Sequence, residues 1–204
     1  MYSQEIEKDK LSVFESPYKY LKTPEEHIHS YLSYLCTILT KLDQKVIAQV
    51  IKLFFQAREE GRTIFFIGNK GSAATASHFA KDLLIRKKSK IFRIISLTGN
   101  STVMTAITND FGFENVFVKQ LESLYRRGDI LVAISASGDS LNVLKAIDYV
   151  KQLRGITIGL TGFDGGELQK KTDYCIHVPT NKGEYGPVED IHLIITHIIA
   201  NYLT

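Results

Sequence analysis

The sequence has few of the residues that stabilise small secreted proteins or anchor a chain in a membrane. Only two cysteines occur, Cys36 and Cys175, without the close spacing of a metal knuckle or redox pair. They exclude a disulfide framework, suit a reducing compartment and are expected to be buried as small apolar side chains. No uncharged stretch approaches the roughly 20 apolar residues of a membrane span, and the N-terminus has no basic segment followed by an apolar one. We therefore expect a cytoplasmic protein with no membrane partner.

Charge of one sign is also scarce, since the formal net charge is only +3. The basic cluster Arg86-Lys87-Lys88 is short and fits a solvated surface better than a nucleic-acid site. We therefore do not expect a nucleic-acid partner. Apolar residues make up 44% of the chain and charged residues 23%, a balance that excludes disorder and predicts a globular protein with a core.

Glycine is absent from the first 60 residues, and all 14 glycines occur from Gly61 onward. Thr23-Pro24-Glu25-Glu26 has the pattern of a capping box with proline at the first helical position. Apolar residues then recur every three or four positions and predict two helices, at about 24–41 and 43–60. The apolar stripe of this N-terminal helical segment, residues 1–60, is either ordinary core or a face that packs against a neighbouring subunit.

Beyond Gly61 the pattern changes to short apolar runs separated by helical segments. The runs lie at 63–67, 91–95, 130–134, 156–160 and 174–178. Continuous apolar strands alternating with helices predict a parallel sheet covered on both faces. We expect residues 61–204 to form a doubly wound, five-stranded, flavodoxin-like α/β domain that makes one structural unit with the N-terminal extension. Ligands of such folds bind at the carboxyl ends of strands, here after Ile67, Ile134 and Leu160.

Two of these strand-to-helix loops carry residues suited to a phosphate. The loop 68–74 (GNKGSAA) opens a helix, and its glycines allow a ligand to approach free backbone N–H groups. It matches neither the dinucleotide fingerprint nor the P-loop, so by itself it is a weak sign of a ligand. The loop 135–140 (SASGDS) has three hydroxyls and a glycine. One serine is enough to cap a helix, so the three together favour phosphate binding.

Two predicted helices carry side chains that bind metal ions. His78 and Asp82 lie four residues apart on one helix face, as either a surface salt bridge or two ligands of one ion. The predicted C-terminal helix is mostly apolar but contains four ionisable residues over 189–199: Glu189, Asp190, His192 and His197. Polar groups in an apolar helix are costly unless they are paired or functional, so both readings stay open here.

Together these motifs resemble the SIS (sugar isomerase) family. The GNKGS and SASGDS loops, the segment 109–113 (NDFGF) and the segment 160–166 (LTGFDGG) carry the resemblance, which covers nearly the whole chain. More narrowly, the chain is similar to the sedoheptulose 7-phosphate isomerases, also called phosphoheptose isomerases. The resemblance implies a homotetrameric aldose–ketose isomerase that makes a D-glycero-manno-heptose 7-phosphate for a surface polysaccharide such as lipopolysaccharide or capsule. Altered sugar-contacting positions, including Thr75 and Asn100, leave another phosphoketose open.

The resemblance also implies a set of substrate-binding residues. It assigns phosphate contacts to Ser135, Ser137 and Ser140. The other implied substrate-binding residues are Asn69, Lys70, Gly71, Ser72, Asp82, Arg86, Asn109, Asp110 and Glu189. Lys70 stands where the family usually has glycine, so its side chain would add positive charge to the site or narrow it.

The resemblance further implies a zinc site, with His78, Asp82, Glu189 and His197 as the four ligands. Asp82 replaces the family's glutamate as general base in a metal-assisted enediol mechanism, with His197 as its acid–base partner. Eight residues separate Glu189 from His197, which is roughly 12 Å along a helix. We therefore predict that the complete site lies between subunits or that Glu189 precedes the regular helix.

A non-catalytic alternative belongs to the same family. SIS proteins include phosphosugar-binding regulators, among them a tetrameric protein that associates with DnaA, and such a protein has no need of metal-binding histidines. Both His78 and His197 are present in this chain, which favours the enzyme over the regulator.

Overall fold

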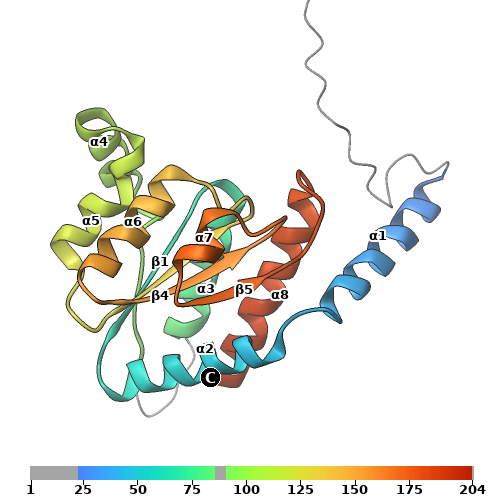
Figure 1. The fold of residues 1–204 in the computed structure, drawn as a ribbon, viewed down its shortest axis with the longest axis horizontal. Helices are drawn as coiled ribbons and strands as arrows, with labels where there is room; N and C mark the ends of the chain where they lie inside the picture. The colour runs from blue at the N-terminus through green and yellow to red at the C-terminus, as the bar shows by residue number, and fades with distance from the viewer. Residues whose placement is uncertain (1–22, 86–90, 204) are drawn as a thin grey trace, which may run out of the picture.

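The computed structural model describes residues 23–85 and 91–203, and its N-terminal part begins with two helices (Figure 1). Helix α1 (Pro24–Leu39) starts with the expected capping box, in which Thr23 and Glu26 exchange two hydrogen bonds of 3.2 Å. Helix α2 (Gln44–Glu59) starts at Asp43, whose carboxylate accepts from the backbone N–H groups of Lys45 and Val46. The two predicted helices are confirmed, with a break close to the expected position.

The centre of the molecule is a sheet of five parallel strands in the order β2-β1-β3-β4-β5. The strands are β1 (Thr63–Gly68), β2 (Arg93–Ser96), β3 (Ile130–Ser135), β4 (Ile156–Thr161) and β5 (Tyr174–His177). The chain enters at β1, adds β2 on one side and then returns to add β3 on the other, so the topological switch point lies between β1 and β3. The doubly wound α/β fold is confirmed, and the ligand site is expected at the carboxyl ends of these two strands.

Helices cover both faces of the sheet (Figure 1). They are α3 (Lys70–Ile85), α4 (Ser101–Phe111), α5 (Val116–Leu124), α6 (Leu141–Gln152), α7 (Gly166–Lys171) and α8 (Tyr185–Leu203), with a short 3₁₀ turn at Phe113–Asn115. Side chains alternate across β1, so Phe66 joins the core beneath α2, α3 and α8, while Phe65 joins the core beneath α5 and α6. None of the helices in the described ranges is both long and apolar enough to cross a membrane.

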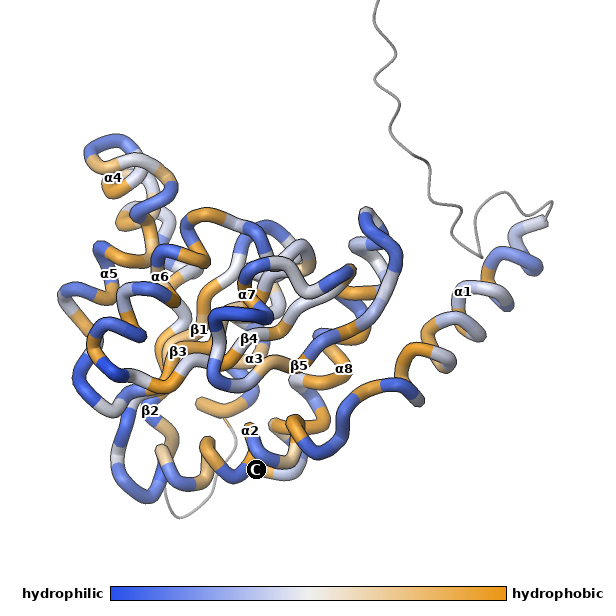
Figure 2. The backbone as a smooth tube through the Cα atoms, in the orientation of Figure 1, coloured by the Kyte–Doolittle hydropathy of each residue, from blue (hydrophilic) through white to orange (hydrophobic). Residues whose placement is uncertain are grey.

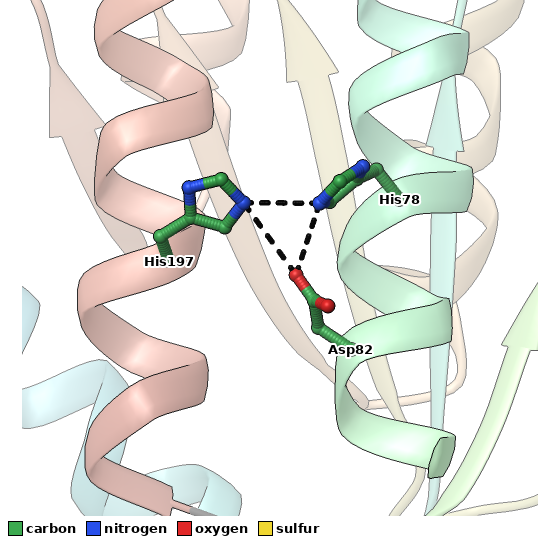
Figure 3. A group of neighbouring side chains, drawn as sticks. All are labelled: His78, Asp82 and His197. Atoms are coloured by element: carbon green, nitrogen blue, oxygen red, sulfur yellow. Dashed lines mark hydrogen bonds and ion pairs between the residues drawn. The ribbon is translucent and has the colours of Figure 1, made fainter. Parts of the chain in front are cut away.

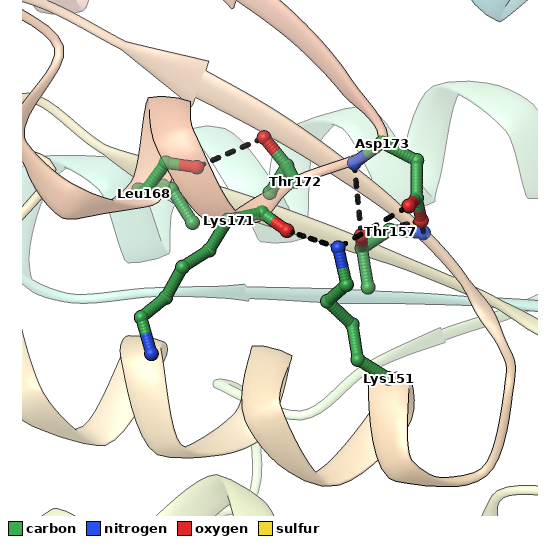
Figure 4. A network of polar contacts seen from close by, with 6 residues as sticks. All are labelled: Lys151, Thr157, Leu168, Lys171, Thr172 and Asp173. Atoms are coloured by element: carbon green, nitrogen blue, oxygen red, sulfur yellow. Dashed lines mark hydrogen bonds and ion pairs between the residues drawn. The ribbon is translucent and has the colours of Figure 1, made fainter.

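A polar network fixes the edge of the sheet beside α7 (Figure 4). The carboxylate of Asp173 accepts hydrogen bonds from the backbone N–H and the hydroxyl of Thr157, at 2.8 and 2.7 Å. Lys151 donates to the carbonyl of Lys171 at 2.6 Å and contacts Asp173. These bonds tie the end of α6 and the end of α7 to the start of β4 and of β5.

Helix α1 projects away from the α/β body (Figure 1), and Figure 2 shows apolar positions along it. Only Ile38 of α1 is buried, whereas Ile28 and Leu32 are more than half exposed. The expectation that both cysteines are buried is wrong, because Cys36 lies exposed on this projecting helix and Cys175 is half-buried. The N-terminal part of the apolar stripe of α1, at Ile28 and Leu32, is therefore not covered by the other described residues.

Candidate functional site

A cavity of about 320 Å³ opens at the carboxyl ends of β1 and β3, at the switch point of the sheet. Its walls come from the loops after β1, β2 and β3, from α4 and the 3₁₀ turn, and from the N-terminal parts of α3 and α8. Four serine hydroxyls line it: Ser72, Ser135, Ser137 and Ser140. The remaining polar side chains of the wall belong to Asn69, Lys70, Thr98, Tyr185 and Glu189.

The loop after β3 is folded around its own serines. The backbone N–H of Gly138 donates to the hydroxyl of Ser135 at 3.2 Å, and the N–H of Asp139 donates to that of Ser137 at 3.3 Å. Gly138 has a φ of 71° and packs against the carbonyl of Gly165, so a side chain at Gly138 would not fit. Glycine is therefore required at this turn, and the serines are held at the cavity wall.

A pair of amides joins the two loops. Asn69 follows β1, Asn142 lies in the first turn of α6, and their side chains exchange hydrogen bonds of 2.8 and 3.0 Å. Asn142 is buried, so its amide needs this partner. The hydrogen bonds of the Asn69 amide join the loop after β1 to the start of α6. They also hold the Asn69 side chain in the cavity wall.

The turn after β4 is hydrogen-bonded to the loop after β3, which carries Ser135, Ser137 and Ser140. The N–H of Gly162 donates to the carbonyl of Ala136 at 3.0 Å, and the N–H of Leu168 donates to that of Gly138 at 2.9 Å. The N–H of Glu167 donates to the carboxylate of Asp139 at 2.9 Å. The loops after β3 and β4 therefore behave as one hydrogen-bonded unit.

A second polar group lies between α3 and α8, where His78, Asp82 and His197 point toward one another (Figure 3). The two histidine Nε2 atoms are 3.0 Å apart, and they lie 3.1 and 3.6 Å from Oδ2 of Asp82. Lys81 contacts the other carboxylate oxygen at 2.6 Å. Burial raises the pKa of Asp82, but the hydrogen bond from Lys81 and the charges of Lys81, His78 and His197 outweigh it, so the pKa lies below its usual value.

These three side chains fit a divalent metal such as zinc. Oδ2 of Asp82 is buried and receives no hydrogen bond from the described residues, although it faces two imidazole nitrogens. Three ligand atoms of a tetrahedral zinc ion lie about 3.3 Å apart when each bond is near 2.0–2.1 Å. The three distances here are close to that value, and two imidazoles with one carboxylate are a common zinc donor set.

Glu189 does not belong to this group. It lies within α8, which begins at Tyr185, so the expectation that it precedes the regular helix is wrong. Its carboxyl group packs against Gly71, where an added Cβ would overlap it. Burial, and secondarily the charge of Asp190, raises its pKa above the usual value. Within one chain the structure therefore brings together three of the four implied metal ligands and places the fourth in the wall of the cavity.

The comparisons with known proteins agree with this architecture. The chain matches the SIS domain family over residues 28–162. It is 39% identical to the phosphoheptose isomerase of Geotalea daltonii, over 88% of this chain and 93% of that protein. The chain belongs to the phosphoheptose isomerase family of SIS-domain proteins. Solved phosphoheptose isomerases from Francisella tularensis and Neisseria gonorrhoeae superpose with TM-scores of 0.82 and 0.81, each at 30% identity over 89% of this chain and 98% of theirs.

Family membership confirms the resemblance drawn from the motifs and makes the chain an isomerase. Seven of the implied substrate-binding residues line the cavity: Asn69, Lys70, Ser72, Ser135, Ser137, Ser140 and Glu189. Gly71 lies behind them against Glu189, and Asp82 lies in the histidine group instead. Arg86 lies outside the described residues.

The other two residues implied by the phosphoheptose isomerase resemblance lie on α4. Asn109 and Asp110 are exposed and bonded to each other at 2.8 Å. Asn109 lines a separate hollow with Met104 and Phe113, which both also border the main cavity. The pair is therefore next to the cavity but outside its wall in a single chain.

Sequence reasoning missed three residues that shape the site. Asn142 lies two residues after Ser140, in the first turn of α6. Its sequence signal was a polar residue at the start of a predicted helix, at a position that is buried in the structure. Lys81 is adjacent to Asp82 in sequence, where a cation beside a candidate ligand could have been noticed. Tyr185 lines the cavity from the first turn of α8 and has no sequence signal of its own.

Proposed function

We propose that this phosphoheptose isomerase relative is a phosphosugar aldose–ketose isomerase that converts sedoheptulose 7-phosphate to a D-glycero-manno-heptose 7-phosphate. The observation that carries the proposal is the cavity at the switch point, with four serine hydroxyls from two loops in its wall. Proteins named phosphoheptose isomerase match nearly the full length of the chain, which supports this substrate class.

The cavity has the chemistry of a phosphate site. Helices α3 and α6 both begin at its wall, and free N–H groups at helix N-termini attract anions. Serine hydroxyls add neutral donors, and Lys70 contributes a positive charge from the start of α3. We assign the phosphate to the loop of Ser135, Ser137 and Ser140, and the sugar to the remaining wall.

His78, Asp82 and His197 would hold the zinc ion. Bound there, zinc supplies Lewis-acid polarisation of oxygen atoms on a substrate. The resemblance gives Asp82 the role of base and His197 that of its partner, and neither lines the cavity of its own chain. Those roles therefore require a substrate that reaches His78, Asp82 and His197, for example one that is bound in the cavity of a neighbouring subunit.

The proposed assembly is a cytoplasmic homotetramer whose active sites are completed by neighbouring subunits. The exposed apolar face of α1 supports it, because Ile28 and Leu32 are 57% and 56% exposed on a helix that projects from the body. Size-exclusion chromatography with light scattering tests the assembly, and a monomer at micromolar concentration would contradict it.

The function is tested with purified protein and sedoheptulose 7-phosphate. We expect isomerisation, loss of activity with a chelator and recovery with added zinc. Unphosphorylated sedoheptulose is the matched control, and we expect it to react at least 100-fold more slowly because the phosphate supplies binding energy. Tight binding of the phosphosugar with no turnover would instead identify a phosphosugar-binding regulator.

A further inference from the structure

Resting on the proposed isomerase function, we propose that Tyr31 and Tyr34 of α1 are positioning residues for the substrate. Their hydroxyls hold the wall segment, residues 184–190, from which Tyr185 and Glu189 line the cavity. Neither tyrosine is among the described residues of the cavity wall, so both act through this segment. Three observations carry the inference.

The first observation is where the two hydroxyls bond. Tyr34 donates to the carboxylate of Glu184, and Tyr31 donates to the carboxylate of Asp190, each at 2.5 Å. The two acceptors are the first and last residues of the wall segment. The two tyrosines lie three residues apart and therefore share one face of α1. One helix face thus holds both ends of the wall segment.

The second observation is the burial of Glu184, which is only 4% exposed. Its carboxylate also accepts from the backbone N–H of Asn181 at 2.9 Å and from the side-chain amide of Asn181 at 3.2 Å. A buried carboxylate is stable only while its hydrogen-bond donors are in place. Because Glu184 directly precedes Tyr185, loss of the Tyr34 hydroxyl disturbs the turn that brings Tyr185 into the cavity wall.

The third observation is the close approach of α1 to the first turn of α8. Gly186 lies in the wall segment, and a Cβ atom there would stand 3.3 Å from Oη of Tyr31. The tyrosine therefore reaches this turn closely because residue 186 has no side chain. The ring of Tyr185 also packs edge-on against Phe163 in the loop after β4, with the ring centroids 5.0 Å apart. Both α1 and the loop after β4 thus hold the wall segment.

Helix α1 has an apolar anchor that is independent of the two tyrosines. Ile38 is buried in the core, and Leu35 and Leu39 pack against that core. The tyrosine hydroxyls add hydrogen bonds to carboxylates, which are stronger than bonds between neutral groups. They therefore fix the orientation of α1 on the wall segment. The same helix exposes Ile28 and Leu32, so a neighbouring subunit bound there would act on the cavity through the tyrosines.

The cavity binds its substrate well only if its wall keeps its shape. The wall contacts the bound sugar phosphate before the reaction and during it, so a displaced wall weakens binding of the ground state and of the transition state equally. Such a change raises KM and leaves kcat almost unaltered. This kinetic pattern separates a positioning residue from a residue that takes part in proton transfer.

The test uses Tyr31→Phe, Tyr34→Phe and the double variant, which remove the hydroxyls and keep the rings. Tyr202→Phe is the matched control, because Tyr202 is exposed at the other end of α8 and packs against Phe55. Kinetics with sedoheptulose 7-phosphate and added zinc give KM and kcat, and calorimetric titration gives the affinity for the phosphosugar. We expect KM to rise and affinity to fall about fivefold in each single variant, and further in the double variant. The kcat values should stay within about twofold of wild type, and the control should match wild type.

Hydrogen exchange measured by mass spectrometry reports on the wall segment directly. Peptides that cover residues 181–192 should exchange faster in the double variant, because the start of α8 loses two of its hydrogen bonds. Peptides from the central strands should exchange as in wild type. Light scattering of the same samples gives the oligomeric state. A rise in KM confined to variants that dissociate would overturn the inference, because the hydroxyls would then act through assembly alone.

The outcomes for the inference and for the proposed function are distinguishable. A double variant whose KM and affinity stay within about twofold of wild type overturns the inference and leaves the proposed function standing. An equal rise in KM for Tyr202→Phe also overturns the inference, because the effect would not depend on the wall segment. Wild-type protein that isomerises no phosphoketose overturns the proposed function. The calorimetric affinities then decide whether the tyrosines position a phosphosugar that is bound without turnover.

Discussion

His78 and His197 face each other with their Nε2 atoms 3.0 Å apart, although 119 residues separate them in the chain. They are brought together because α3 and α8 pack side by side over the same face of the sheet, with Phe79 and Ile195 buried in one core. The contact between the histidines is therefore a product of tertiary packing, and any metal bound there would join the two helices.

A metal that joins these helices gives the first prediction. His197→Ala removes one of three converging ligand atoms, and we expect zinc affinity to fall about 100-fold or more. Equilibrium dialysis or competition with a chromogenic chelator measures it. His29→Ala, at an exposed position on α1, is the control and should bind zinc like wild type. Equal affinity in both variants would contradict the site.

Lys70 gives a prediction in which stability and binding change in opposite directions. Its φ is 51°, a left-handed conformation that costs a non-glycine residue of order 1 kcal/mol and that glycine adopts freely. Lys70→Gly should remove this strain and the charge, so the melting temperature rises while phosphosugar affinity falls roughly tenfold.

The matched control is Lys70→Ala, which removes the charge but keeps the strained backbone. It should lose affinity to the same extent without the gain in melting temperature. Thermal unfolding and calorimetric titration of both variants check the two effects separately. A lower melting temperature for Lys70→Gly than for Lys70→Ala would show that the conformation is not strained.

The Asn69–Asn142 pair gives a third prediction. Asn142→Ala leaves the amide of Asn69 without its partner across the two loops, and we expect unfolding free energy to fall by about 2 kcal/mol. The KM for the phosphosugar should rise because both loops line the cavity. Urea unfolding of Asn69→Ala, of Asn142→Ala and of the double variant gives the coupling free energy between the two residues. Additive losses of unfolding free energy would contradict a direct pair.

Much of the fold was predictable because its signals are local. The capping box at Thr23 and the apolar runs of the strands depend on neighbouring residues, and both were found close to their observed bounds. The shared helix face of His78 and Asp82 follows from a spacing of four. Helix geometry also indicated that Glu189 and His197 are too far apart to bind one ion from a straight helix.

What could not be predicted depends on packing between distant segments. The exposure of Cys36 results from the direction in which α1 leaves the body, which no local pattern encodes. Asn142 pairs with Asn69 because the fold brings the start of α6 next to the loop after β1. The placing of Glu189 in the cavity wall, apart from the histidines, required the alignment of α3 against α8.

His192 gives the last prediction, which concerns the pH dependence of stability. It is fully buried in α8, its Nε2 bonds the carbonyl of Thr161 at 3.1 Å, and its Nδ1 has no hydrogen-bond partner among the described residues. Burial lowers its pKa to about 4; the hydrogen bond to Thr161 opposes this shift, and the charge of His177 adds to it.

In the unfolded chain this histidine takes up a proton near pH 6.5, whereas in the folded chain it stays neutral down to about pH 4. The unfolded state therefore binds more protons in this window, and unfolding free energy falls as pH drops through it. Above pH 6.5 His192 does not lower the unfolding free energy, and near pH 4 it lowers this free energy by about 3 kcal/mol. His192→Gln keeps a donor for Thr161 but cannot titrate. Urea unfolding from pH 7.5 to 4 measures the unfolding free energies of wild type and of this variant. As pH falls, the unfolding free energy of wild type should decrease relative to that of the variant. A difference that stays constant with pH would contradict a buried histidine that is neutral in the folded chain.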